Sequence, residues 1–239
     1  MFVGFMGEML GTLVLILMGN GVVACVLLSD SKGNGGGWIS ITAGWGFAVL
    51  AGVVVAIAAG SQGHLNPAVT FAFAYASGDT TKILPYITGQ FVGAFLGATL
   101  VWLSYLAHWP KTENPALKLA CYSTGPAIRD VKANLLTEAI GTFLLVFVVV
   151  GIFSKAVGTV GALGPMMVGL LVWGIGLSLG GPTGYAINPA RDLGPRVAHA
   201  LLPIAGKGSS DWGYAWIPVA GPIIGGLIAI AVAKATGMA

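Results

Sequence analysis

The chain has 239 residues, of which 56% are apolar and only 8% are charged, and its formal net charge is +3. A soluble domain carries about 25% charged residues, so a chain of this composition is predicted to lie in a bilayer rather than in water. Eleven basic and eight acidic residues are also too sparse for a surface that binds nucleic acid.

Six stretches are long and apolar enough to cross a membrane, which takes about 20 residues as a helix. They are predicted at roughly 3–28, 38–60, 83–107, 133–154, 160–181 and 213–236. The first stretch lacks the basic start and the small-residue cleavage site of a signal peptide, so we expect it to be retained. Two further apolar pieces, at about 67–76 and 189–202, are too short to cross, because a helix rises about 1.5 Å per residue and the apolar core is about 30 Å thick.

The two halves of the chain repeat each other. Gly-Glu-Met-Leu-Gly-Thr at 7–12 resembles Thr-Glu-Ala-Ile-Gly-Thr at 137–142, and Asn-Pro-Ala occurs at 66–68 and again at 188–190. Each half thus consists of a span, a span, a half-span and a span. Because three crossings is an odd number, the second half must enter the membrane from the opposite side, which indicates an inverted repeat.

The predicted fold is therefore an all-α membrane protein with six transmembrane helices and two re-entrant half-helices. The whole chain, 1–239, is assigned to one domain. Its first repeat covers about 1–107, a polar connecting loop covers about 108–131, and the second repeat covers about 132–239.

Each Asn-Pro pair is typical of a helix start. Asn is a good N-cap, and Pro suits the first turn, where its missing N–H would have had no partner. Two such starts from opposite faces would meet near the midplane with their positive dipole ends together. Asn66 and Asn188 would supply amide donors there, and the loops at 60–65 and 180–187 would supply carbonyl oxygens. This arrangement predicts a pathway for small hydrogen-bonding molecules that opposes cations, including hydrated protons.

The sequence resembles the major intrinsic protein family, the aquaporins and glycerol facilitators, over nearly its whole length. The resemblance rests on Glu8 and Glu138 with their following Gly-Thr, on His-Leu-Asn-Pro-Ala-Val-Thr at 64–70, and on Gly-Tyr-Ala-Ile-Asn-Pro-Ala-Arg-Asp-Leu-Gly-Pro-Arg at 184–196. In having Asp directly after Asn-Pro-Ala-Arg, the sequence resembles the glycerol-conducting branch of this family. The resemblance implies a homotetramer with one pore per subunit, in the plasma membrane with both termini cytoplasmic, without a cofactor and without enzymatic chemistry.

The resemblance also implies a narrow selectivity filter made of aromatic residues and one arginine. Arg191, three residues after Asn188, would donate to a passing hydroxyl and repel cations. Tyr185 takes the place that glycerol facilitators usually fill with Phe. Gly176 matches a small residue that leaves room for a carbon chain, where a water-selective channel typically carries His. The alternative for Gly176 is simple helix packing, and the alternative for Arg191 is a side chain that reaches the outer surface.

The remaining filter position falls on an aromatic residue near the start of the second span. Glycerol facilitators carry a Trp twenty residues before the first Asn of the motif, and Trp45 lies twenty-one before Asn66. One extra residue within 56–63 would restore the match, so Trp45 is predicted, with Phe47 as the alternative.

Three other titratable residues require an interpretation. Glu8 and Glu138 are carboxylates inside spans, and a proton relay is one hypothesis for them. The resemblance implies a structural role instead, in which each accepts hydrogen bonds from loop backbone and braces a half-helix, and this is favoured because the pair repeats with the scaffold. His64 is expected to be a neutral, hydrogen-bonded residue beside the pore loop rather than a metal ligand, because the other histidines are distant in sequence.

No disulfide and no metal site is predicted. The two cysteines, Cys25 and Cys121, give neither a disulfide framework nor metal-ligand spacing. With three scattered histidines they also cannot supply the nucleophile, base or metal cluster of an enzyme.

Basic residues do not support the orientation that the resemblance implies. With both termini cytoplasmic, three lysines fall inside, and seven basic residues fall outside or near the outer boundary: Lys32, Lys111, Lys118, Arg129, Lys132, Arg196 and Lys207. This distribution opposes the positive-inside rule.

The leading functional hypothesis is a passive channel for glycerol and other small neutral solutes, together with water. A second hypothesis is a channel that conducts mainly water, or one for another uncharged solute such as urea, dihydroxyacetone, hydrogen peroxide or lactic acid. A third is an ion-coupled secondary transporter, which can also be built from inverted repeats and broken helices.

Overall fold

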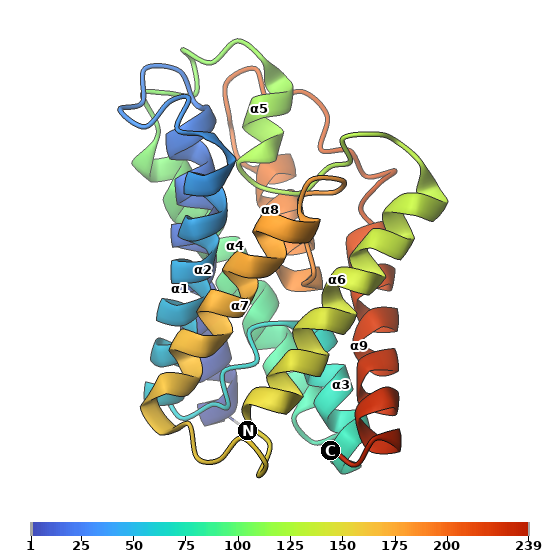
Figure 1. The fold of residues 1–239 in the computed structure, drawn as a ribbon. Helices are drawn as coiled ribbons and strands as arrows, with labels where there is room; N and C mark the ends of the chain where they lie inside the picture. Colours follow the sequence, from blue (N-terminus) through green and yellow to red (C-terminus); the bar gives the residue numbers. More distant parts are fainter. Residues whose placement is uncertain (1, 239) are drawn as a thin grey trace.

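The structure is a computed structural model that describes residues 2–238, and within them every regular element is helical (Figure 1). Six helices are long and apolar enough to cross a bilayer, the fifth of them together with a preceding 3-10 turn at Gly161–Leu163. These are α1 (Phe2–Leu27), α2 (Gly37–Ala58), α4 (Ile83–Ser104), α6 (Val131–Ile152), α7 (Gly164–Leu179) and α9 (Ile217–Ala235). The predicted all-α membrane fold with six spans is confirmed, and each boundary differs from the expectation by only a few residues.

Two shorter helices, α3 (Pro67–Ser77) and α8 (Pro189–Leu201), are the predicted half-helices. At about 1.5 Å per residue they are each much shorter than the bilayer core. In Figure 1 α3 lies in the half of the molecule that contains both chain ends, and α8 lies in the opposite half, beside α5. The two half-helices therefore enter the bundle from opposite faces.

The two repeats pack in the same way. Helix α1 packs against α2 and α4, and α6 packs against α7 and α9. Two glycines allow the closest approaches: a Cβ atom at Gly93 would lie 2.1 Å from the Met9 carbonyl oxygen, and one at Gly225 would lie 2.0 Å from that of Ala139. Because any larger residue would collide with backbone, these helix pairs depend on glycine.

A third Asn-Pro-Ala, at 114–116, was not singled out from the sequence. It starts the short helix α5 (Pro115–Ala120) inside the connecting loop, and Asn114 caps that helix by accepting from the backbone N–H of Ala116 at 2.9 Å. The motif thus starts a helix wherever it occurs. Its place in the membrane at the other two positions comes from the apolar spans around it.

The outer surface of the bundle is apolar. Large hydrophobic side chains on the long helices are widely exposed, among them Ile39, Leu84, Leu136 and Leu170. A soluble protein rarely exposes so continuous an apolar belt. Together with the six spans, this surface identifies a multi-pass membrane protein.

Candidate functional site

The two asparagines of the repeated motif meet at the centre of the bundle. Asn66 donates from Nδ2 to the Ile187 carbonyl oxygen at 2.7 Å, and Asn188 donates from Nδ2 to the Leu65 carbonyl oxygen at 2.7 Å. Each side-chain oxygen also caps its own half-helix, by accepting from the backbone N–H of Ala68 or of Ala190. Since an amide nitrogen carries two N–H groups, each asparagine keeps one donor for a molecule beside it.

The backbone before each asparagine is bent in the same unusual way. Leu65 and Ile187 have φ angles of 52° and 43°, and three residues before each asparagine Gly63 and Tyr185 have φ angles of 70° and 40°. Non-glycine residues seldom adopt positive φ, and they keep it only where the surroundings impose it. The bends take these peptide groups out of helical register, and the carbonyl oxygens of Leu65 and Ile187 accept from the paired asparagines.

Two buried glutamates impose those bends. Glu8 accepts hydrogen bonds from the backbone N–H groups of His64 and Leu65 at 2.9 and 2.7 Å. Glu138 accepts from the N–H groups of Ala186 and Ile187 at 3.0 and 2.8 Å. One hydroxyl in each loop completes the match, since Ser61 donates to Glu8 and Thr183 donates to Glu138. Both oxygens of each carboxylate accept hydrogen bonds, which agrees with the bracing role expected for the two glutamates.

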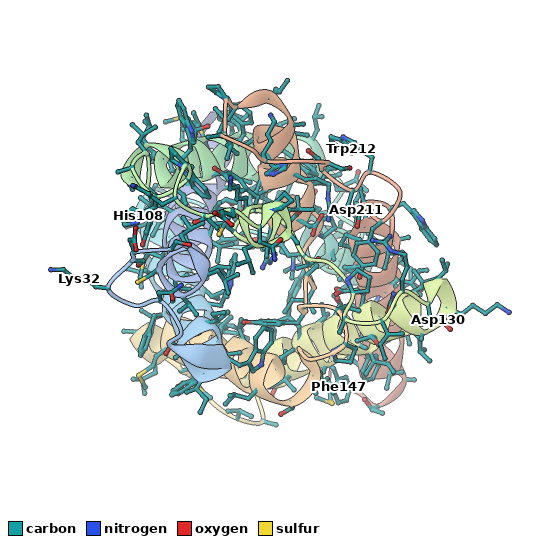
Figure 2. All side chains as sticks on the ribbon, turned by 90° about the horizontal axis from the view of Figure 1, so that it is seen from above. Lys32, His108, Asp130, Phe147, Asp211 and Trp212 are labelled. Atoms are coloured by element: carbon teal, nitrogen blue, oxygen red, sulfur yellow. The ribbon has the colours of Figure 1, made fainter. Side chains whose placement is uncertain are left out.

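A cavity of about 530 Å³ runs beside the two asparagines. Its lining combines apolar side chains with residues of the two loops, the two asparagines and an arginine. The apolar side chains include Leu15, Val49, Val53, Val69, Leu145, Val149 and Val172. Seen from above, side chains of both repeats surround an opening near the middle of the molecule (Figure 2).

Arg191 and Trp45 lie together in the wall of this cavity. The guanidinium carbon of Arg191 lies 3.9 Å from the centre of the Trp45 ring, a cation–π contact. Arg191 is 7% exposed, and its Nη1 atom has no hydrogen-bond partner among the described residues. The arginine therefore does not reach the outer surface, and its Nη1 atom is itself buried, with the guanidinium against the Trp45 ring.

The aromatic alternative, Phe47, lies elsewhere. It is 55% exposed on the outside of α2 and packs against Trp173, with ring centroids 6.2 Å apart, whereas Trp45 is buried and lines the cavity. Of the two candidates, Trp45 is thus the one in the position that a filter residue requires. Its role in selection stays a prediction.

Tyr185 lines the cavity, and Gly176 lies behind it. A Cβ atom at Gly176 would lie 2.7 Å from Cζ of Tyr185. The space that glycine leaves is thus filled by the tyrosine ring, and the lining residues include Tyr185 but not Gly176. This geometry differs from the expectation that the glycine itself leaves room for a solute.

His64 also lines the cavity, and its ring is hydrogen-bonded. The His64 Nδ1 atom lies 3.2 Å from the hydroxyl oxygen of Thr70, and the tautomer of the ring decides which of the two atoms donates. The same hydroxyl oxygen accepts from Gln90 at 3.0 Å. This contact agrees with the hydrogen-bonded histidine expected here. Within the described residues no cluster of metal-ligating side chains occurs.

A buried ion pair joins α8 to the loops of the face opposite the chain termini. Asp192 and Arg196 are both fully buried, with 2.8 Å between Nη2 and Oδ1. Asp192 accepts from the backbone and the hydroxyl of Thr124, and Arg196 donates to the carbonyl oxygens of Thr124 and Ser210. The Arg196 side chain thus turns inward to a pair on this face and is not a free surface charge. The spacing of four residues between Asp and Arg was the available signal.

Comparison with known proteins agrees with this geometry. The family model described as major intrinsic protein matches residues 2–232. The chain is 54% identical to the "Probable glycerol uptake facilitator protein" of Thermotoga maritima over 94% of this chain and 95% of the relative. It is 53% identical to the "Glycerol uptake facilitator protein" of Streptococcus pneumoniae over 95% of this chain and 96% of the relative.

A solved structure shows the same fold. The aquaglyceroporin from Plasmodium falciparum superposes with a TM-score of 0.87 at 30% sequence identity, covering 97% of this chain and 95% of that chain. The sequence matches, the shared fold and the paired asparagines agree: the chain belongs to the major intrinsic protein family.

Proposed function

We infer that the protein is a passive channel that conducts glycerol and other small uncharged solutes, together with water, and excludes ions and protons. The observation that carries this inference is the mixed lining of the cavity, in which apolar side chains occur together with the two loops, the two asparagines and Arg191. A polyol has carbon atoms along one edge and hydroxyl groups along the other, so it matches both kinds of lining residue. The relatives named as glycerol uptake facilitators support the same solute.

Exclusion of cations follows from the charges at the centre and in the wall. The N-termini of α3 and α8 meet at the two asparagines, and both present positive dipole ends to the cavity. Arg191 adds a full positive charge beside Trp45. A cation that loses water in this passage finds no carboxylate among the described lining residues, and Glu8 and Glu138 accept hydrogen bonds from the loops instead.

The protein is further proposed to be a homotetramer in the cell membrane, with both termini in the cytoplasm. The two chain ends lie on one face of the bundle, as six crossings require (Figure 1). Cross-linking in membranes tests the assembly, and protease access to a C-terminal tag in sealed vesicles tests the orientation.

Stopped-flow light scattering of proteoliposomes tests the proposed function. Water, glycerol and urea gradients are applied with and without a proton gradient. Fast glycerol entry that does not depend on the proton gradient supports the proposal. Water flux without glycerol entry favours a water-selective channel, and glycerol accumulation driven by protons favours a coupled transporter.

A further inference from the structure

A group of residues outside the cavity determines where the Tyr185 ring lies. Trp38 and Thr42 on α2, with Gly176 and Gly180 at the end of α7, surround this ring on the side away from the lumen, and we call them the Tyr185 socket. None of the four is among the described residues that line the cavity, whereas Tyr185 is.

The socket is tight on the side of α7. A Cβ atom at Gly176 would lie 2.7 Å from Cζ and 2.9 Å from the hydroxyl oxygen of Tyr185. A Cβ atom at Gly180, one turn later, would lie 2.6 Å from Cδ1 of the same ring. Real Cβ contacts are not this short, so any side chain at these glycines must displace the ring.

Helix α2 supplies the other wall. The Trp38 ring meets the Tyr185 ring edge to face, with centroids 5.9 Å apart and an interplanar angle of 79°. The indole N–H of Trp38 donates to the Gly176 carbonyl oxygen at 3.1 Å, which fixes the indole against α7. The methyl group of Thr42 lies 2.9 Å from the position that a Cβ atom would take at Gly176, so it closes the gap between the two helices.

No hydrogen bond holds the Tyr185 ring in this position. Its hydroxyl oxygen is buried and has no partner among the described residues. A buried hydroxyl usually has a partner, and here only packing keeps the ring back from the lumen. The shape of the socket therefore decides how far the ring projects into the passage.

We propose that the Tyr185 socket is the positioning device for solute selection, with Gly176 and Trp38 acting through Tyr185 rather than by contact with the solute. This inference rests on the proposed function. It assigns a selective effect to Trp38, a residue that is 41% exposed and does not line the cavity.

A double-mutant cycle in proteoliposomes tests the proposal. Gly176→Ala is expected to push the ring into the lumen and to lower glycerol permeability about tenfold, as overpacking by one methyl group implies, while water permeability falls less. In the Tyr185→Ala background the same substitution is expected to change glycerol permeability less than about twofold, because no ring is left to displace. Gly174→Ala is the matched control on α7, since a Cβ atom there meets nothing within 4 Å.

Trp38→Ala gives an independent readout that does not depend on the assembly of an overpacked variant. Removal of one wall lets the ring move away from the lumen, so the ratio of erythritol to glycerol permeability is expected to rise about threefold or more. Ile39→Ala, at a neighbouring position that is 68% exposed, is the matched control. Equal losses from Gly176→Ala in both backgrounds, or an unchanged solute ratio in Trp38→Ala, would overturn the proposal. A wild-type protein that does not conduct glycerol would instead reject the proposed function.

Discussion

Replacement of Glu138 by glutamine tests whether this carboxylate braces the second pore loop. Glu138 accepts from the Thr183 hydroxyl and from the N–H groups of Ala186 and Ile187. Glutamine keeps the shape but has only one acceptor oxygen. If the amide nitrogen takes the Oε2 position, it faces the Ile187 N–H, and if it takes the Oε1 position, it faces the Ala186 N–H. In either orientation one buried backbone donor loses its acceptor.

The expected loss follows from that count. A buried donor left without a partner costs about 1–3 kcal/mol. At about 2–4 °C per kcal/mol for a chain of this size, a loss of about 2 kcal/mol lowers the unfolding midpoint by about 4–8 °C. Glycerol permeability per folded protein is also expected to fall, because the Ile187 carbonyl oxygen that holds Asn66 belongs to the same loop.

Thermal unfolding in detergent, followed by tryptophan fluorescence, measures the midpoint, and stopped-flow light scattering measures the permeability. Glu113→Gln makes the same chemical change at an exposed position and is expected to leave both values unchanged. A Glu138→Gln protein with a wild-type midpoint would refute the bracing role. Loss of proton-driven solute accumulation with a wild-type midpoint would support the proton relay instead.

Three further substitutions, one of them compared with a surface control, test other parts of the structure. Arg191→Ala is expected to raise proton leak and to loosen solute selection, because it removes the only charge in the cavity wall among the described lining residues. A pH-sensitive dye measures the proton leak, and solute gradients measure the selectivity. Unchanged values of both would argue against the place of Arg191 in the filter. Asn66→Asp keeps the capping oxygen but replaces the donor to the Ile187 carbonyl oxygen with an acceptor. Glycerol permeability is therefore expected to fall by about tenfold or more, equivalent to about one lost hydrogen bond. Wild-type glycerol flux in this variant would contradict the pairing of the two half-helices. Asp192→Asn breaks a fully buried ion pair and is expected to cost about 3–5 kcal/mol in a thermal unfolding assay. Arg129→Ala, which removes a surface pair with Asp211, is expected to cost less than about 1 kcal/mol, and equal midpoints for these two variants would refute the assigned difference.

Composition and repetition were sufficient to predict the membrane fold. An apolar stretch of about 20 residues matches the thickness of the bilayer core when it forms a helix. The number of spans and their approximate bounds can therefore be predicted from the sequence. The doubled Asn-Pro-Ala within the repeated spans was sufficient to predict two opposed half-helices, and the bracing of their loops by the two glutamates was implied by the family resemblance. Such local patterns predict the fold well because backbone groups inside a bilayer must be hydrogen-bonded within the protein, which leaves few structures other than helices.

The filter needed more than local signals. Trp45 and Phe47 differ by two positions on one helix, and only the packed bundle shows that the first points inward and the second outward. The identical Asn-Pro-Ala at 114–116 caps a helix outside the spans, so the motif alone does not place an asparagine in a pore.

The sequence by itself determined the class of protein, the number of spans and the two pore asparagines, because burial in lipid and helix capping are decided within one segment. Only the tertiary structure decided that Asp192 and Arg196 form a buried pair, and that the space at Gly176 is filled by Tyr185. Both facts depend on which side chain from a distant segment occupies a given volume, and a packed interior sets that through contacts among several helices at once.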